Sequence, residues 1–273
     1  LLEWFKNYLS DRQQRVVING QMTEWGLIEA GVPQGSVRGP LLFLLYIDDI
    51  VHVVRNCKIR LFADDTCLFI EVHNREDTAR LLNEDLAAMA AWSEQWLVTF
   101  APTRTKSLII SNKTDKHLNP RVELMGTPID EVDSHTYLGI RIATNLRWKD
   151  HIQDVATKAR RKLNLMQPLK MKVDRKSLEI MYRSFVKPTM EYAIAVWGGT
   201  YDLDLAKLEN IHLDAKRLIT GATARSIIVK VDSEMPCASV QDRIDVASLC
   251  MMYKIIRGDA PQYLKNIKTY CLR

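Results

Sequence analysis

Residues 58–71 read Lys-Ile-Arg-Leu-Phe-Ala-Asp-Asp-Thr-Cys-Leu-Phe-Ile-Glu, and this stretch contains the clearest chemical signal in the chain. Lys58–Phe62 and Cys67–Glu71 are short runs of strand-forming residues, separated by Ala-Asp-Asp-Thr. The pattern predicts a tight β-hairpin with Asp64 and Asp65 at its tip. Folding gives no reason to place two like charges beside apolar strands, so we expect both carboxylates to have a function.

Adjacent carboxylates on a tight turn suit a divalent metal ion. Mg²⁺ prefers oxygen ligands and usually binds one or two carboxylates together with substrate phosphates. Nucleotidyl transfer uses two such ions about 4 Å apart, of which one activates the attacking hydroxyl and the other stabilises the leaving pyrophosphate. Asp64 and Asp65 are therefore candidate metal ligands and catalytic residues, with Mg²⁺, or alternatively Mn²⁺, as the cofactor.

The segments around this hairpin predict a mixed region of helices and strands that ends near residue 145. A glycine-rich loop covers residues 31–36, and the helix that follows it is apolar on every side, which predicts that it is buried. We expect helices over residues 1–9, 40–46 and 76–97, and strands over residues 15–19, 23–28, 107–111, 121–125 and 135–142. The first two strands form a hairpin that turns at Asn19-Gly20.

After Asn145 the apolar residues recur at helical spacing, so the rest of the chain is expected to be all-helical and the fold class to be α+β. One helix places Ile152, Val155, Ala159, Leu163 and Met166 on its core face. A second uses Leu178, Met181, Tyr182 and Phe185 and stops at Pro188. A third uses Leu205, Leu208, Ile211, Ala215 and Leu218 and ends at Gly221. The last runs from Ser239, an N-cap, to Gly258.

Positive charge is concentrated in one segment of the 273-residue chain, whose net charge is +5. Residues 146–176 contain ten Lys or Arg and three Asp, so this segment alone has a charge of +7. Such a concentration indicates either a polyanion-binding surface or a solvated helix face, and charge alone favours neither. Lys158, Arg161 and Lys162 are expected to project from the side of their helix opposite the core.

Other sequence features narrow the class of protein. The five cysteines show no zinc-ligand spacing, which predicts free thiols. The chain starts at Leu1 without a recognisable signal peptide, and no apolar run reaches the roughly 20 residues that span a bilayer. We therefore expect an intracellular protein that makes no use of a membrane. Neither its compartment, nucleus or cytoplasm, nor its oligomeric state is predicted.

Several of these motifs together resemble the reverse transcriptases of non-LTR (LINE-type, jockey-like) retrotransposons. Residues 62–66 resemble the active-site box of that family, and residues 31–36 with 39–43 resemble the loop and helix that precede it. Tyr137-Leu138-Gly139 resembles the primer-gripping hairpin, and residues 146–152 resemble the start of the thumb. The lead-in matches at Tyr8-Leu9, Arg12, Gln14 and Val16. The similarity covers essentially the whole chain and is strongest from residue 8 to 152.

The resemblance implies an RNA-directed DNA polymerase whose partners are an RNA template, a DNA primer and deoxynucleoside triphosphates. Residues 1–145 would be part of the palm, an antiparallel sheet with packed helices, and residues 146–273 a helical thumb and tail. It also implies that Gln34, Gly35, Ser36, Phe62 and Ala63 contact the nucleotide and template. Lys158, Arg161 and Lys162 would follow the backbone of the template–primer duplex.

The chain departs from the family pattern in several places. Arg38 stands where the family usually has an apolar residue. Arg104 replaces a lysine proposed as general acid for the leaving pyrophosphate, and arginine hardly releases a proton because its pKa exceeds about 12. Lys106 is a candidate substitute, although as a strand residue it could face the other way.

Two further points bear on the catalytic carboxylates. Tyr46-Ile47-Asp48-Asp49 spells another reverse transcriptase box, but it follows a helix, so we interpret Asp48 and Asp49 as capping or pairing residues at the helix end. The family's first catalytic aspartate would lie upstream of Tyr8. We therefore expect this chain to lack it and to be inactive alone, either as a fragment of an active polymerase or as a decayed remnant that binds nucleic acid without catalysis.

Overall fold

The computed structural model describes residues 1–28, 31–111, 120–200, 202–223 and 226–266. The chain forms two compact units. The first unit is Leu1–Ser107 with Asp115–Asp130, and the second is Leu108–Thr114 with Glu131–Arg273. The division after residue 130 places the hairpin of residues 134–143 with the helices, whereas the sequence pattern predicts a boundary near residue 145. The assignment to palm and thumb stays a prediction.

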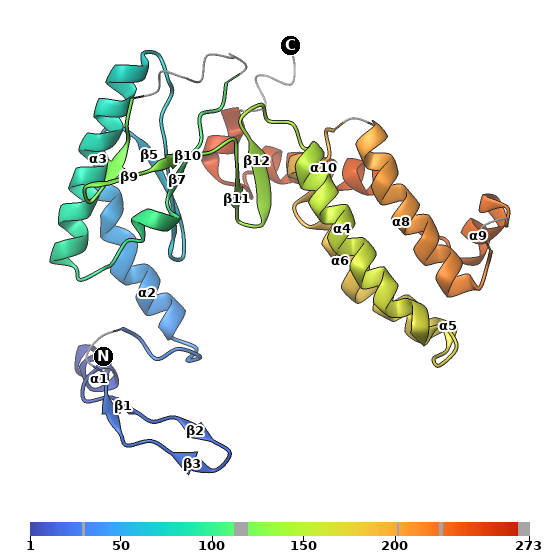
Figure 1. Cartoon of the computed structure of the whole chain (residues 1–273), viewed down its shortest axis with the longest axis horizontal. Coiled ribbons are helices and arrows are strands. Elements are labelled where there is room, and N and C mark those ends of the chain that lie inside the picture. The colour runs from blue at the N-terminus through green and yellow to red at the C-terminus, as the bar shows by residue number, and fades with distance from the viewer. Residues whose placement is uncertain (29–30, 112–119, 201, 224–225, 267–273) are drawn as a thin grey trace. The chain divides into compact units, whose positions relative to one another are not determined.

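The described residues of the first unit form helices and short hairpins (Figure 1). Its helices are α1 (Leu2–Leu9), α2 (Gly39–Ile47) and α3 (Arg75–Gln95), with 3-10 turns at Asp48–His52 and Pro102–Arg104. Its strands are β1 (Gln13–Gln14), β2 (Val17–Ile18), β3 (Gln21–Met22), β4 (Gly26–Leu27), β5 (Lys58–Phe62), β6 (Asp65–Phe69), β7 (Lys106–Ser107), β8 (Glu123–Leu124) and β9 (Thr127–Pro128). The two-residue strand β10 (Asp130–Glu131) spans the boundary between the two units along the chain.

The strands of the described residues pair only in twos, and the pairs β1–β4, β2–β3, β5–β6, β8–β9 and β11–β12 are antiparallel. The expected mixture of helices and antiparallel strands is present, but a larger sheet is not formed in this part of the chain. Most of these strands contain only two residues, too few backbone groups to hold a third strand. The hairpin turning at Asn19-Gly20 is confirmed, since Ile18 lies opposite Gln21.

Helix α3 forms the core of the first unit, as its periodicity predicts. Met89 and Trp92 are buried in one cluster with Ile47 and Ile50, and Trp96 packs against that cluster. Asn74 caps the start of the helix by accepting a hydrogen bond from the backbone N–H of Glu76 at 2.9 Å. The cluster is small, so it covers only part of the apolar surface around it.

Helix α2 is present but is not the buried helix that we expected. Ile47 is buried at its end, whereas the side chains of Leu41 and Leu45 are 59% and 66% exposed. Because the helix is apolar on every side, any single cluster can cover only one of its faces. The prediction of burial was therefore wrong for the remaining faces in this structure.

From Glu131 onward, the second unit consists of a hairpin followed by a helical assembly (Figure 1). The hairpin is β11 (Ser134–Tyr137) and β12 (Ile140–Ala143). The helices are α4 (Lys149–Met166), α5 (Arg175–Met181), α6 (Lys187–Glu191), α7 (Ile194–Trp197), α8 (Asp202–Thr220), α9 (Ile228–Glu234) and α10 (Val240–Arg257). A π-turn, Tyr182–Val186, joins α5 to α6, and 3-10 turns cover Gln167–Leu169 and Gln262–Asn266.

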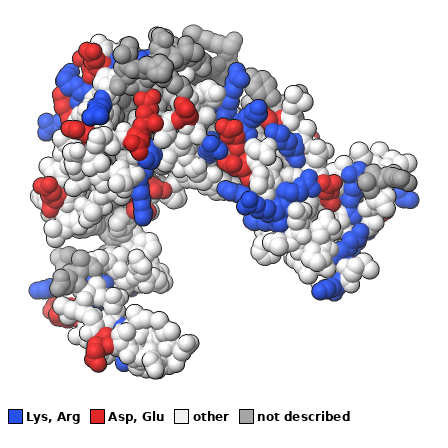
Figure 2. Space-filling view, viewed as in Figure 1, with Lys and Arg blue, Asp and Glu red and all other residues white. Residues whose placement is uncertain are grey.

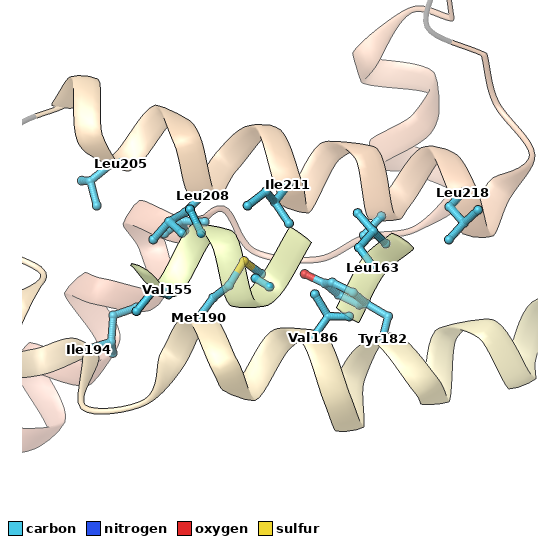
Figure 3. Packing of buried hydrophobic residues seen from close by; sticks show 14 of the residues in the cluster. Val155, Leu163, Tyr182, Val186, Met190, Ile194, Leu205, Leu208, Ile211 and Leu218 are labelled. Atoms are coloured by element: carbon cyan, nitrogen blue, oxygen red, sulfur yellow. The ribbon is translucent and has the colours of Figure 1, made fainter. Parts of the chain in front are cut away.

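One continuous apolar core holds this unit together, and the core faces expected for α4 and α8 are confirmed. Figure 3 shows side chains of α8 pointing toward those of the π-turn and α6. Every predicted core residue of these two helices is buried: Ile152, Val155, Ala159, Leu163, Met166, Leu205, Leu208, Ile211, Ala215 and Leu218. Helix α10 also has its predicted ends, since Ser239 forms a capping box with Asp242 and Gly258 closes it with a φ of +84°.

The helix around Pro188 differs from the prediction. Phe185 is 60% exposed, Val186 is fully buried in its place, and the helix continues past Pro188 to Glu191. The cause is the π-turn, in which the N–H of Lys187 bonds to the carbonyl of Tyr182. One extra residue in the turn shifts the buried face by one position, and the looser ladder accommodates a proline ring that would otherwise clash with the preceding turn.

The strand expected over residues 107–111 is also mostly absent, because β7 covers only Lys106–Ser107. From Leu108 the chain belongs to the second unit, where the N–H of Ser111 bonds to the carbonyl of Thr144 at 3.0 Å. Among the described helices, none combines the length and apolar composition that crossing a membrane requires.

Candidate active site

The hairpin that contains the two aspartates is formed as predicted, but its turn is tighter. Strand β6 starts at Asp65 rather than Cys67, and Asp65 lies opposite Phe62. The turn therefore consists of Ala63 and Asp64 alone. Ala63 has a φ of +52°, a left-handed conformation that lets the chain reverse within two residues. Asp64 thus lies in the turn and Asp65 on the first position of the strand.

The two faces of the hairpin have different environments. Ile59, Leu61 and Leu68 pack against the apolar cluster of the first unit, while Phe62 and Asp65 lie on the other, exposed face. Both Asp64 and Asp65 are exposed, and within the described part of the chain neither carboxylate takes part in an ion pair or a side-chain hydrogen bond. Their oxygens are therefore free to bind a cation.

The two residues fit a divalent ion as a pair, not as a complete cage. Among the described residues there is no group of three or more His, Cys, Asp or Glu side chains that would hold a metal alone. Mg²⁺ commonly keeps several waters and binds one or two carboxylates plus substrate phosphates, so a pair is consistent with such an ion.

A buried carboxylate holds the base of this hairpin. Asp85 of α3 is only 2% exposed and accepts backbone N–H groups from Arg55 at 3.0 Å, Asn56 at 2.9 Å and Cys57 at 2.7 Å. These three residues lead directly into β5, so Asp85 joins the start of the hairpin to the helix beneath it. The sequence interpretation missed this residue, although its position between Leu82 and Leu86 places an aspartate on an apolar helix face.

The contact affects the ionisation of both partners. Burial alone would raise the pKa of Asp85, but the hydrogen bonds from Arg55, Cys57 and Asn56 together hold this pKa below its ordinary value. Burial, followed by the hydrogen bond to Asp85, raises the pKa of the Cys57 thiol to about 12. The carboxylate therefore stays ionised and the thiol stays protonated at neutral pH.

The glycine-rich loop presents Gln34 to solvent. The N–H of Ser36 bonds to the carbonyl of Pro33 at 3.2 Å, which makes Gln34 and Gly35 the central residues of a turn, and Gly35 has a φ of +83°. The Ser36 hydroxyl donates to Pro33 at 2.8 Å and accepts from the N–H of Gly39 at 2.9 Å, so it also holds the start of α2. Gln34 is exposed, whereas the Ser36 hydroxyl is already engaged.

The two cations considered for the leaving group have different environments. Arg104 is exposed at the end of a 3-10 turn, while the ammonium of Lys106 forms an ion pair with Asp130 at 2.7 Å. In the described structure no hydrogen bond or ion pair links either of them to Asp64 or Asp65.

Asp48 and Asp49 lie where the sequence places them, in a 3-10 turn directly after α2. The expectation that they cap or pair is wrong for the described structure, because their side chains make no capping hydrogen bond and no ion pair there. The turn's N-cap residue is Ile47, which has no side-chain oxygen to offer. Both aspartates are exposed to solvent instead.

The basic helix α4 divides the three predicted cations into two kinds. Lys158 and Arg161 are exposed and have no side-chain partner among the described residues. The ammonium of Lys162 instead donates to the carbonyl of Phe185 at 3.1 Å and to the hydroxyl of Thr189 at 2.7 Å. In Figure 2, Lys and Arg side chains gather over the part of the second unit where Figure 1 places α4.

The strand expected over residues 135–142 is instead the β11–β12 hairpin, which turns at Leu138-Gly139 with Tyr137 opposite Ile140. The role of this turn as a primer grip stays a prediction. The turn contacts Tyr192, which the sequence interpretation did not single out. No periodic or motif signal marks that tyrosine, because its partner lies far away in the sequence.

Comparisons with known proteins agree with the motifs. Residues 2–142 match a family described as reverse transcriptase (RNA-dependent DNA polymerase). The chain is 29% identical over 228 residues to the probable RNA-directed DNA polymerase from transposon BS of Drosophila melanogaster, covering 79% of this chain and 25% of that protein. It is 25% identical over 247 residues to the probable RNA-directed DNA polymerase from transposon X-element of the same fly, covering 88% and 27%.

A third relative, the RNA-directed DNA polymerase from mobile element jockey of Drosophila melanogaster, is 28% identical over 227 residues, covering 80% of this chain and 25% of that protein. The chain thus spans about a quarter of the length of these curated relatives. No solved structure matches it.

Proposed function

Because this chain belongs to the reverse transcriptase (RNA-dependent DNA polymerase) family of LINE-type retrotransposons, we propose that it is the part of an RNA-directed DNA polymerase that holds the catalytic metal through Asp64 and Asp65. The observation that supports this most is the hairpin itself. It exposes two adjacent carboxylates that are free of ion pairs, while its other face is packed against the apolar cluster.

The bound ion would be Mg²⁺, with Mn²⁺ as a substitute, and it would neutralise charge on the substrate phosphates during nucleotidyl transfer. The role of Asp64 and Asp65 is to supply two negative oxygens on a short, rigid turn. Asp85 supports that role by holding the start of β5, since positioning and charge neutralisation provide most of the catalysis in phosphoryl transfer.

The other proposed contacts concern the substrates, which are an RNA template, a DNA primer and deoxynucleoside triphosphates. Gln34 and Gly35 would lie against the nucleotide and template, with Phe62 and Ala63 beside them and Ser36 mainly shaping the loop. The exposed guanidinium of Arg104 suits a contact with phosphate, whereas Lys106 is held by Asp130. The Leu138-Gly139 turn would contact the primer.

A second candidate function is binding of nucleic acid without catalysis. It is favoured by Lys158 and Arg161 of α4, which are exposed and have no side-chain partner among the described residues. We propose that the 273-residue chain alone does not polymerise, and that residues from the rest of a longer protein, such as those of its relatives, complete the site.

Primer extension tests the catalytic proposal. The isolated chain is expected to show no template-dependent extension with Mg²⁺ or Mn²⁺, and a longer protein containing this region is expected to be active. In that protein Asp64→Ala or Asp65→Ala should abolish extension, because losing a metal ligand removes most of the charge neutralisation. Asp48→Ala and Asp49→Ala are the matched controls, with a far smaller loss. Equal, complete loss in both pairs, with the fold intact, would contradict the assignment.

Salt-dependent binding tests the nucleic-acid face. The chain should bind RNA–DNA hybrid weakly and without sequence preference, with an affinity that falls steeply as salt rises. The Lys158→Gln, Arg161→Gln double change should lower the slope of log affinity against log salt by about two. Lys162→Gln alone should change this slope little, because its ammonium is bonded within the helical unit. Binding that is indifferent to the double change would favour a merely solvated face.

A further inference from the structure

The turn of the β11–β12 hairpin has an unfavourable backbone conformation. Leu138 has a φ of +48° and Gly139 a φ of +80°. The second value is ordinary for glycine, but a leucine in the left-handed region is strained by about 1 kcal/mol or more. Such a conformation persists only where the surroundings hold it, so the contacts of this turn decide its shape.

Tyr192 provides those contacts from a distant part of the chain. Its hydroxyl donates to the carbonyl of Leu138 at 2.8 Å, and its ring lies so close to Gly139 that an added Cβ there would be 3.2 Å from its Cε1 atom. The phenol therefore covers the turn and bonds to the carbonyl of the strained residue. A Cβ at this position would be closer to the ring than ordinary van der Waals contact, so the ring would have to shift by a few tenths of an ångström.

The backbone of Tyr192 is bonded to the core of the helical unit. The indole N–H of Trp197, a fully buried side chain, donates to the carbonyl of Tyr192 at 2.9 Å. Ala193 follows with a φ of +52°, which turns the chain away from α6 and leaves the phenol pointing at the hairpin. The backbone of Tyr192 is therefore held independently of its hydroxyl.

A second attachment joins the strands of the hairpin to α4. The N–H of Arg141 donates to Nδ1 of His151 at 3.2 Å, and the Arg141 guanidinium bonds to Ser134 at 3.1 Å and to Asp154 at 3.3 Å. The hairpin is thus held at its turn by Tyr192 and along its strands by α4. It belongs mechanically to the helical unit.

We propose that Tyr192 is a positioning residue, which holds the Tyr137–Gly139 turn in the shape that contacts the 3′ end of a primer strand. The inference rests on the proposed function, in which this turn meets the primer. The ligand class is an RNA–DNA hybrid with a recessed DNA 3′ end. Because the turn is attached to the helices, it follows α4 when that helix follows the duplex backbone.

The test uses the full 273-residue chain and compares Tyr192→Phe with the control Tyr253→Phe. Tyr253 is an exposed tyrosine of α10, and among the described residues its hydroxyl bonds to Arg257 of the same helix alone. The Phe change at 192 keeps the ring and removes one hydrogen bond. Hydrogen exchange of residues 134–143 should become roughly two- to ten-fold faster in Tyr192→Phe, and stay unchanged in Tyr253→Phe.

The second measurement is competition at low salt between two hybrids of equal length, one with a recessed DNA 3′ end and one blunt. Wild type should prefer the recessed end, and Tyr192→Phe should lower that preference by roughly the same factor as the exchange while binding the blunt hybrid normally. A role confined to stability would not move this ratio.

The outcomes separate the inference from the proposal beneath it. Unchanged exchange in Tyr192→Phe overturns the inference, and so does faster exchange with an unaltered preference for the recessed end. A wild-type chain that binds both hybrids equally overturns the primer contact itself and, with it, the positioning role. Faster exchange together with a reduced preference supports both.

Discussion

Two hairpins, one in each unit, are held in different ways. The β5–β6 hairpin is anchored at its base, where Asp85 accepts three backbone N–H groups, and its tip is left free with two exposed carboxylates. The β11–β12 hairpin is held along its strands by α4 and, unlike β5–β6, also at its tip, by the hydroxyl of Tyr192. The difference suits their proposed tasks. A metal-binding tip must stay open to the substrate, whereas a turn that supports the primer strand works better when its shape cannot change.

The largest effect is expected from breaking the base anchor. Asp85→Ala would leave three backbone N–H groups of residues 55–57 without their acceptor and should lower the unfolding free energy of the first unit by roughly 3 kcal/mol. Denaturation that is monitored through hydrogen exchange in residues 55–69 measures this loss of unfolding free energy. Glu94→Ala on the same helix is the matched control, since Glu94 is exposed and unpaired among the described residues. A loss confined to the helical unit would contradict the anchor.

The two units are expected to lose stability in different pH ranges as the solution is acidified. In the second unit burial, and then Arg243 and Lys216, lower the pKa of His212 to about 4. The unfolded chain binds this proton near pH 6.5 and the folded chain does not, so stability is lost as pH falls below about 6.5. The loss should reach roughly 2 kcal/mol between pH 7 and pH 5.

The first unit should lose stability only at lower pH. The pKa of Asp85 is depressed in the folded state, so its contribution is complete above about pH 4 and disappears below that value. Exchange rates measured in each unit from pH 7 to pH 4 test the order. His212→Gln should reduce the loss of stability of the second unit between pH 7 and pH 5. His135→Gln, at an exposed position, should leave that loss unchanged. A first unit that weakens before the second would refute the assignment.

A smaller effect is expected from two matched glycines. Gly126 and Gly139 each follow a residue of positive φ and have φ values of +70° and +80°. A Cβ at Gly126 meets nothing within 4 Å, whereas one at Gly139 meets the ring of Tyr192. Gly126→Ala should therefore lower the unfolding free energy by about 1 kcal/mol, and Gly139→Ala by about 1 kcal/mol more.

The control for this pair is the background Tyr192→Ala. Removing the ring should make the two glycine substitutions equally costly, because only the backbone strain remains. Denaturant titration of Gly126→Ala and Gly139→Ala in both backgrounds, each compared with its parent protein, gives the cost of each glycine substitution. An equal cost in the wild-type background would mean that the ring yields easily and does not shape the turn.

Local patterns predicted the elements, and they failed where distant contacts decide. The core faces of α4 and α8, the Asn19-Gly20 turn and the capping of α10 follow from spacing and turn chemistry within a few residues. The register at Phe185 was wrong because a π-turn adds one residue, and no periodicity shows this in advance. The exposure of α2 depends on how much partner surface the chain offers.

The candidate site shows the same division. Asp64 and Asp65 are predicted as metal ligands because two like charges stand between strand-like runs, and this role stays a prediction. Asp85 could have been found, since an aspartate on an apolar helix face needs partners. Tyr192 could not, because its hydrogen bond joins residues 54 positions apart. The engagement of Lys162 by Phe185 and Thr189 likewise depends on tertiary geometry.

The raised pKa of Cys57 has a practical consequence in reaction kinetics. Thiol reagents attack the thiolate, and with a pKa of about 12 only a minute fraction of Cys57 is ionised at pH 8. Alkylation of this thiol must then wait until residues 55–57 separate from Asp85. Its rate would report how often the base of the β5–β6 hairpin opens, measured at one atom by mass spectrometry and without any substrate. The exposed Cys250 would react before Cys57, and its alkylation rate would serve as the internal reference for that of Cys57.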